Sequence, residues 1–274
     1  MRGREDEALA RAAVDALTGQ LALVPKPGLP DPRDLAARAT RQDHRLLRWS
    51  AKALTPGLAA MAAAARRTGE PTSQLRAELG AIGRCTEHSV HLAGGGHRGA
   101  LWALGLLVAA AALDPGAGAR EVAASARRIA AHRDRGAPRR PSRGSSVSVK
   151  YGAAGARGEA KAGFPHVRRA LDALDAARTA GAGEEQARLD ALLTVMSTLQ
   201  DTELLHTAGP LGLRHVQAGA REVLAAGGTA TRPGRAALAA LDTDLHARAW
   251  SPRGSAGLLA GALFLDTLPV GPRG

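Results

Sequence analysis

The feature that most constrains the fold is the kind of apolar side chain that this sequence uses. Hydrophobic residues make up 45% of the 274 residues, a fraction typical of globular proteins, but aromatic residues make up only 2%. Most of the apolar residues are alanine, followed by leucine and valine. Small side chains fill little volume, so such a core needs closely packed helices. Strands favour β-branched and aromatic residues, which are scarce here. The sequence therefore predicts an all-α protein.

The spacing of the apolar residues predicts where the helices lie. Ala10, Ala13, Leu17 and Leu21 recur at helical spacing, which indicates a helix over residues 5–23. Further helices are expected over residues 41–65, with a bend at Pro56 and Gly57, and over residues 73–91, 100–113, 119–132, 154–163, 165–180, 184–199, 211–226, 233–248 and 255–268. The sequence shows neither an internal repeat nor an alternating strand pattern.

One segment marks a possible internal boundary. Residues 133–148 combine five arginines with proline, glycine and serine, a composition typical of an exposed loop or a disordered segment. We expect the helical halves on either side to pack into one compact multi-helix domain over residues 1–274, with a flexible tail over residues 269–274.

The chain carries a formal net charge of +12 and has a pI near 11.3. This balance permits a polyanionic partner such as a nucleic acid, a nucleotide or an anionic membrane surface. Only four residues are lysine, namely Lys26, Lys52, Lys150 and Lys161, so nearly all the positive charge is arginine. A GC-rich genome supplies arginine together with alanine, glycine and proline. Composition alone therefore accounts for most of the excess.

Several classes of protein are excluded or disfavoured. The single cysteine, Cys85, excludes an internal disulfide and a cysteine-cluster zinc site, and its apolar helix predicts a small core residue. Residues 1–13 contain three acidic residues and no apolar segment, so they do not read as a secretory signal. The longest apolar run, residues 100–113, is shorter than the roughly 20 residues needed to cross a bilayer. We expect a soluble, cytoplasmic protein without a membrane partner.

Two loops could hold a phosphate group. Four prolines between Pro25 and Pro32 force an extended backbone, which could hold the Lys26 ammonium toward a phosphate or simply connect two helices. The turn Gly94–Gly99 precedes an apolar helix and contains His97 and Arg98, so its backbone N–H groups could bind an anion. No Gly-Lys-Ser/Thr follows, so this turn is not a Walker loop. A flexible turn without a ligand is the alternative.

Three further segments could carry chemistry. Residues 155–165 place Arg157 and Glu159 between glycines, which suits either backbone contact with a ligand or tight helix crossing. Asp201, Glu203 and His206 follow an apolar helix and could bind Mg²⁺, act as a general acid or base, or cap a helix turn. Residues 251–259 precede another apolar helix and could bind phosphate or serve as an ordinary helix cap. His88 and His91 lack a third ligand for a metal site.

In this order, the motifs resemble those of the triphosphoribosyl-dephospho-CoA synthase family, which serves malonate decarboxylase or citrate lyase. The resemblance runs from Pro25 to Phe264. It rests on Pro25-Lys26-Pro27-Gly28-Leu29 with Asp31, on His97-Arg98-Gly99 and the helix after it, on Gly155-Ala156-Arg157-Gly158-Glu159-Ala160 with Gly163-Phe164-Pro165, on Asp201-Thr202 and Leu204-Leu205-His206, and on Ser251-Pro252 with Gly254-Ser255-Ala256.

The resemblance implies an all-α transferase that uses ATP and 3′-dephospho-CoA, with the nucleotide site formed by the loops rich in glycine and proline that join the helices. The 2′-hydroxyl of dephospho-CoA would attack C1′ of the ATP ribose, and adenine would leave. The product would be the precursor of a prosthetic group, which a separate transferase attaches to an acyl-carrier subunit. Mg²⁺ is expected with the triphosphate, and no tightly bound organic cofactor is implied. The resemblance implies no specific nucleic-acid partner, and it leaves the oligomeric state open.

The resemblance also implies roles for individual residues. The attacking hydroxyl needs a base, and the leaving adenine gains from protonation, for which Glu159 and Asp201 are the candidates. Asp201 is equally a candidate for binding Mg²⁺ through the triphosphate. The substrate- and nucleotide-binding candidates are Lys26, Gly28, Asp31, Gly95, Gly96, His97, Arg98, Gly99, Arg157, His206, Ser251 and Ser255.

Several positions depart from the family pattern. A histidine expected soon after Asp31 is missing from residues 34–43, and the Gly-rich turn lacks the usual asparagine and threonine. Arg143, Glu203 and Gly257 stand where the family usually has histidine, asparagine and aspartate. The first alternative is therefore a catalytically weakened paralogue that binds a nucleotide or CoA. A second alternative is a basic nucleic-acid-binding protein, although no aromatic stacking platform or known reader motif is present.

Overall fold

The computed structural model describes residues 2–33, 44–138 and 142–269, and their regular structure is entirely helical. The helices are α1 (Arg2–Leu21), α2 (His44–Ala51), the 3-10 turn η2 (Lys52–Leu54), α3 (Thr55–Thr68), α4 (Ser73–Leu92), α5 (Arg98–Leu113), α6 (Ala119–Ala131), α7 (Arg143–Tyr151), α8 (Gly155–Lys161), α9 (Pro165–Thr179), α10 (Glu184–Met196), α11 (Thr202–Thr207), α12 (Gly209–Ala225), α13 (Arg232–Ala247) and α14 (Arg253–Asp266). The predicted all-α fold is confirmed.

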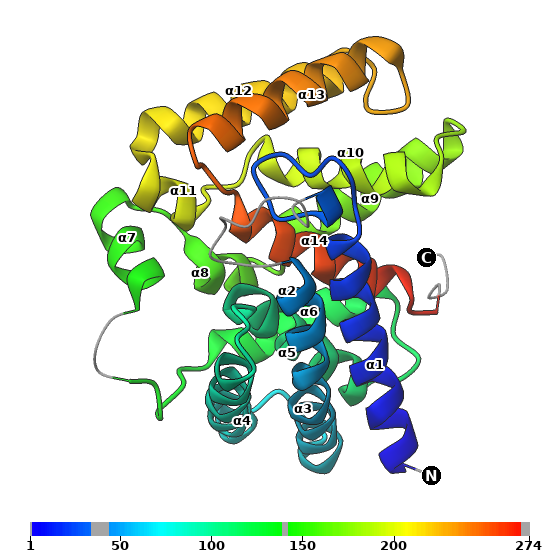
Figure 1. Cartoon of the computed structure of the whole chain (residues 1–274). Coiled ribbons are helices and arrows are strands. Elements are labelled where there is room, and N and C mark those ends of the chain that lie inside the picture. The colour runs from blue at the N-terminus through cyan, green and yellow to red at the C-terminus, as the bar shows by residue number, and fades with distance from the viewer. Residues whose placement is uncertain (1, 34–43, 139–141, 270–274) are drawn as a thin grey trace.

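Two nearly fully buried helices, α5 and α14, form the centre of one hydrophobic core (Figure 1). The first packs against α3, α6 and α14, and the second against α1, α5 and α9. Small residues allow these close approaches. A Cβ at Gly105 would lie 2.5 Å from Met61 Sδ, and a Cβ at Gly261 would lie 3.1 Å from Leu107 Cδ1. The aromatic-poor composition is thus matched by closely packed helices.

The outer helices surround this centre. Helix α1 lies along α3 and α14, and α9 packs against α10. Helices α12 and α13 form an antiparallel pair across one end of the molecule, joined to the rest through α10 and α11 (Figure 1). The segment after α13 then leads back into the N-terminus of α14. Loops from both halves of the sequence therefore meet near the beginnings of the two central helices.

Most predicted helices agree with the structure, and the differences have local causes. The expected helix over residues 41–65 is divided by η2, after which α3 begins with Pro56 in its first turn. Residues 41–43 of that expected helix lie outside the described residues. So does the segment 34–43, from which the family's histidine is missing. The loop expected over residues 133–148 is shorter, because Ser142 Oγ accepts from Ser145 N and caps α7. Of the expected tail, residues 270–274 lie outside the described residues.

Two further observations concern exposure. Cys85 was expected to be a small core residue, but it is exposed, because it lies on the outward face of α4. That expectation was wrong, since α4 buries a stripe that includes Leu79, Gly83 and Val90 instead. Among the described residues, no helix has both the length and the apolar character needed to span a bilayer.

Candidate active site

The N-termini of the two central helices lie against each other. A Cβ at Gly257, the fifth residue of α14, would lie 3.2 Å from the backbone N of Ala100 in the first turn of α5. The first backbone N–H groups of a helix have no partner within the helix, and the helix dipole makes this end positive. At α14 the carboxylate of Asp201 already takes this place, so the N-terminus of α5 is the end that favours a further anion.

Asp201 joins this region to α11. Its Oδ1 accepts hydrogen bonds from the backbone N–H groups of Glu203 (2.9 Å) and Leu204 (3.4 Å), and so caps α11. Its Oδ2 accepts from the backbone N–H of Ser255 in α14, at 3.2 Å. Burial raises the pKa of this carboxyl to about 6, although the backbone N–H donors oppose the shift. A carboxyl with this pKa can take up or release a proton near neutral pH.

Two serine hydroxyls at the start of α14 complete this cluster. The Oγ atoms of Ser251 and Ser255 are buried, and neither has a hydrogen-bond partner among the described residues. Ser255 as a whole is 1% exposed. Buried polar groups without a partner are rare in folded proteins, so these two hydroxyls mark the start of α14 as a candidate binding position. The start of α14 lies beside the N-terminus of α5, which favours an anion.

The Gly94–Gly99 turn leads into α5. His97 is buried, and its Nε2 lies 2.8 Å from the carbonyl of Leu47 and 3.1 Å from Ser50 Oγ. Burial lowers its pKa, although the contact with the Leu47 carbonyl opposes the shift. The side chain therefore fastens α2 to the start of α5. Arg98 is exposed and lies 3.2 Å from Glu87 Oε1 on α4.

Three glycines of the same turn were expected to contact a nucleotide. A Cβ at Gly95 would overlap Ser50, so this residue must be small for the turn to pack on α2. Gly96 lies in the exposed part of the turn. A Cβ at Gly99 would have open space around it. Of these three, Gly99 is the one that reaches the junction between α5 and α14.

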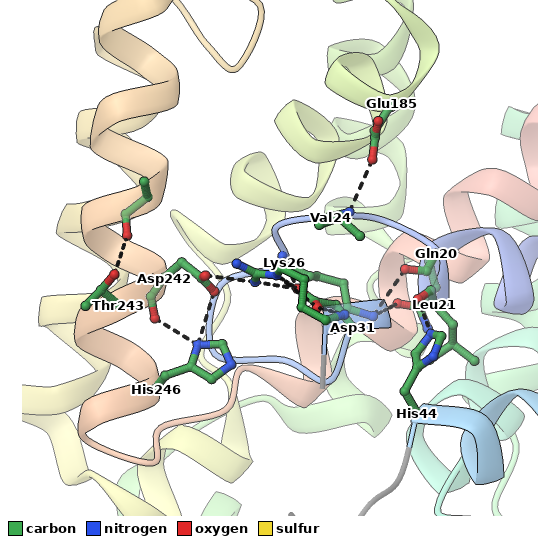
Figure 2. Close-up of polar contacts among 12 residues, drawn as sticks. Gln20, Leu21, Val24, Lys26, Asp31, His44, Glu185, Asp242, Thr243 and His246 are labelled. Atoms are coloured by element: carbon green, nitrogen blue, oxygen red, sulfur yellow. Dashed lines mark hydrogen bonds and ion pairs between the residues drawn. The ribbon is translucent and has the colours of Figure 1, made fainter. Parts of the chain in front are cut away.

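The loop of four prolines is held by polar contacts to the neighbouring helices (Figure 2). Lys26 is 1% exposed, and its Nζ donates to the backbone carbonyl and the side-chain Oε1 of Gln20, at 3.2 Å each. The ammonium that was expected to reach a phosphate is thus buried against α1. Gly28 has a φ of +65°, and a Cβ there would overlap the carbonyl oxygen of Trp250. This contact places the loop next to the segment that carries Ser251.

Asp31 connects the same loop to α13 through Arg33. It accepts from the backbone N–H of Lys26 (3.1 Å) and from Arg33 Nε (2.9 Å), and Arg33 Nη2 also lies 2.8 Å from Asp242 Oδ2. Burial of Asp31 favours a higher pKa, but the Arg33 side chain and the backbone donors hold its pKa below the ordinary value. His246 lies on the far side of Asp242, with Nδ1 at 3.1 Å from Oδ1 (Figure 2). Asp31 therefore has a structural role in this loop.

Glu159 is hydrogen-bonded to His166, a residue that the sequence analysis did not identify. Its Oε1 accepts from the backbone N–H of His166 at 2.8 Å, and its Oε2 lies 2.7 Å from His166 Nδ1. Phe164, between them, has a φ of +55°, a conformation that is rare for a residue with a side chain. His166 Nε2 is buried without a hydrogen-bond partner among the described residues. Its position seven residues after Glu159 was the only signal in the sequence.

The remaining predicted residues lie on the surface. Arg157 is exposed on α8, and His206 is exposed on α11, one turn beyond the capped end. The structure thus brings together Gly99, Asp201, Ser251 and Ser255. Lys26, Asp31, His97 and Glu159 instead make contacts within the protein. No group of three or more His, Cys, Asp or Glu side chains in the described part of the chain could hold a metal ion.

Comparison with known proteins gives concordant results. The model of a family described as ATP:dephospho-CoA triphosphoribosyl transferase matches residues 6–273. Three relatives carry the name probable 2-(5′′-triphosphoribosyl)-3′-dephosphocoenzyme-A synthase. The protein from Stutzerimonas stutzeri is 49% identical, covering 96% of this chain and 92% of its own. Those from Pseudomonas aeruginosa (50%, covering 98% and 94%) and Azotobacter vinelandii (48%, covering 96% and 91%) are similar. No solved structure matches the chain significantly.

Proposed function

This chain belongs to the ATP:dephospho-CoA triphosphoribosyl transferase family, and we propose that it forms 2′-(5′′-triphosphoribosyl)-3′-dephospho-CoA. In this reaction the 2′-hydroxyl oxygen of 3′-dephospho-CoA bonds to C1′ of the ATP ribose. The bond between C1′ and adenine breaks, the hydroxyl loses a proton, and adenine gains one. The triphosphate stays on the transferred ribose throughout.

The observation that carries this proposal is the junction of the α5 and α14 N-termini. Both proposed substrates bear phosphate chains, and the N-terminus of α5, beside the start of α14, is suited to bind one. The Ser251 and Ser255 hydroxyls have no partner among the described residues and are free to donate to phosphate oxygens. Gly257 keeps the two helix ends in contact, because a Cβ there would press on the Ala100 backbone.

We assign the proton transfer to Asp201. A general acid or base works best when its pKa lies near the working pH, and burial brings the pKa of Asp201 to about 6. Its carboxyl lies at the same helix junction, hydrogen-bonded to Ser255 N. We assign Glu159 a positioning role, because it fixes the ring of His166 and leaves Nε2 directed away from that contact.

The remaining features of the proposal concern substrates and destination. Mg²⁺ would enter with the triphosphate as part of the nucleotide substrate. Both oxygens of Asp201 already accept backbone hydrogen bonds, so this carboxylate alone does not fit a magnesium site. We propose no tightly bound organic cofactor. The product would pass, in the cytoplasm, to a separate transferase that loads an acyl-carrier subunit of malonate decarboxylase or citrate lyase.

Adenine release from ATP in the presence of dephospho-CoA and Mg²⁺ tests this proposal. We expect release that requires both nucleotides, and a loss of about a hundredfold or more in Asp201→Asn, as is typical for a proton-transfer group. Asparagine keeps one acceptor oxygen for the cap of α11, but its amide nitrogen cannot accept from Ser255 N. Urea unfolding of this variant therefore shows how much of any loss is structural. Full activity in Asp201→Asn would contradict the assignment. Glu159→Gln, with its fold intact, should lower kcat less than Asp201→Asn does.

The same assay separates the alternative function. A paralogue that only binds would show tight ATP or dephospho-CoA binding by calorimetry and no adenine release from folded protein. Its motivation is the set of departures from the family pattern at Arg143, Glu203 and Gly257. Adenine release that depends on dephospho-CoA would exclude it.

A further inference from the structure

A cluster of arginines lies outside the helix junction, on α4 and α8. Arg84 Nη1 lies 2.7 Å from Asp134 Oδ2, and Arg76 Nη1 lies 3.9 Å from the same oxygen. Gly80, between the two arginines on α4, leaves the space that the Asp134 carboxylate occupies, because a Cβ there would overlap it. One carboxylate is therefore shared by two guanidinium groups.

Arg157 adds a third positive charge to this cluster. Burial lowers the pKa of the Arg76 guanidinium, Asp134 opposes the shift, and the neighbouring charges of Arg157 and Arg84 add to it. Two guanidinium groups thus share one carboxylate, and the charge of Arg157, on α8, acts on Arg76 in the same cluster. Such an excess of like charge is unfavourable unless solvent or an anion offsets it.

The arginine nearest the interior also lacks a hydrogen-bond partner. The side chain of Arg76 is 13% exposed, and its Nη1 is buried with no hydrogen-bond partner among the described residues. The 3.9 Å to Asp134 is an ion-pair distance but too long for a hydrogen bond. The guanidinium lies over the ring of Trp102, with 5.6 Å between Cζ and the ring centroid. This stacking holds the fork of N–H donors in place.

We propose that Arg76, Arg84 and Arg157 form a binding subsite for a phosphate chain, with Trp102 as its floor. Guanidinium groups bind phosphate oxygens through paired N–H donors, and a chain with several negative charges offsets the excess at this cluster. Arg157 belongs to the motif that carries the family resemblance, whereas no sequence signal pointed to Arg76 or Arg84. Both ATP and dephospho-CoA carry such a chain, so only the identity of the chain rests on the proposed function.

Titration with inorganic tripolyphosphate tests the subsite without any catalysis. Calorimetry at low salt should show binding that weakens about tenfold to a hundredfold in Arg76→Met and in Arg157→Met, since each removes charge-assisted hydrogen bonds. Arg67→Met is the matched control, because Arg67 is exposed and pairs with Glu78 on α4. It should change the affinity less than twofold. Thermal unfolding checks that each variant is folded.

Fluorescence of Trp102 locates the bound anion. In a Trp49→Phe/Trp250→Phe background, tripolyphosphate should change the emission of the remaining tryptophan, and Arg76→Met should remove that change. Unchanged affinity in folded Arg157→Met and Arg76→Met would overturn the subsite. Should Arg76→Met fail to fold, the exposed Arg157→Met decides the question alone.

The KM values of the Arg157→Met variant identify which phosphate chain binds at this subsite. If the bound chain belongs to ATP, Arg157→Met raises the KM for ATP and leaves the KM for dephospho-CoA near its original value. If the bound chain belongs to dephospho-CoA, the variant raises the KM for dephospho-CoA and leaves the KM for ATP near its original value. The two proposals also fail separately. Tripolyphosphate binding that depends on Arg76, without adenine release, would keep the subsite and reject the transferase. Adenine release with unaltered tripolyphosphate binding in both variants would do the opposite.

Discussion

Individual residues of the proline-rich loop show which parts of a motif sequence reasoning can interpret. The requirement for glycine at Gly28 follows from its positive φ and from the Trp250 carbonyl beside it. The burial of Lys26 could not be predicted, because its partner Gln20 belongs to another element and the lysine lies in a motif suggestive of phosphate binding. Cys85 was misplaced for a similar reason, since helical spacing shows a face but not which neighbour covers it.

Replacement of Gly28 by alanine tests the close approach of the loop to Trp250. We expect Gly28→Ala to lower the free energy of unfolding by about 3 kcal/mol, from the left-handed backbone and from the overlap with the carbonyl oxygen. Gly69→Ala is the control, because Gly69 has a φ of +74° but open space around it. It should cost only about 1 kcal/mol. Equal losses in urea unfolding would show that the contact with Trp250 is unimportant.

The raised pKa of Asp201 predicts a pH dependence of stability. Its pKa is about 6 in the folded protein and 3.8 in the reference state, so the folded state holds the proton more tightly. The stabilisation that the folded protein gains from protonated Asp201 is therefore fully present below pH 4, and it is lost as the pH rises through 6. By linkage, the wild type loses up to about 3 kcal/mol over this range through Asp201, and Asp201→Asn does not.

This difference is measured by urea unfolding of both proteins at several pH values between about 4 and 7. The stability of Asp201→Asn relative to the wild type should rise over that range. Asp15→Asn, an exposed change on α1, corrects for the general effect of removing one negative charge. A relative stability that stays constant with pH would show that the carboxyl titrates normally.

Among the elements, most helices could be predicted, including the short α8, whereas α7 and α11 could not. The helices from α4 to α6, and from α9 to α14 except α11, lie within a few residues of their expected positions. Helix α11 has six residues, too few for a periodic pattern, and exists because Asp201 caps it. Helix α7 was missed because its glycine and serine content is typical of a loop, although Ser142 caps it. The helix junction itself required the fold, since α5 and α14 are far apart in sequence.

The functional importance of the contact between α5 and α14 can be tested with two glycines on one face of α14. Gly257→Ala would press a Cβ against the Ala100 backbone, whereas Gly261→Ala, one turn further on, would meet only side-chain atoms of Leu107 and Val167. We expect Gly257→Ala to lower kcat/KM about tenfold, because small displacements of binding groups are costly to catalysis. Gly261→Ala should retain activity close to that of the wild type. A similar loss in both variants would indicate a general packing effect.

For the whole molecule, the apolar composition and the positive net charge have separate explanations. The Ala-rich, aromatic-poor sequence corresponds to one core built on two central helices, as the sequence predicted. Of the 37 basic residues, many form ion pairs at the surface, such as Arg178 with Glu184 and Asp266. A smaller set differs, because Arg76 and Arg84 share a single carboxylate and the charge of Arg157 acts on Arg76. The family was evident from motif order, whereas the contacts of each motif residue depend on the assembled fold.

The central claim is that the ribose and its triphosphate are transferred as one unit. Incubation of the protein with dephospho-CoA and ATP labelled at the γ-phosphate tests it most directly. The account predicts that the label appears in a dephospho-CoA derivative whose mass includes the triphosphoribosyl group, in equal amount to the adenine released. Label in free phosphate or pyrophosphate, or a labelled product without adenine, would contradict it.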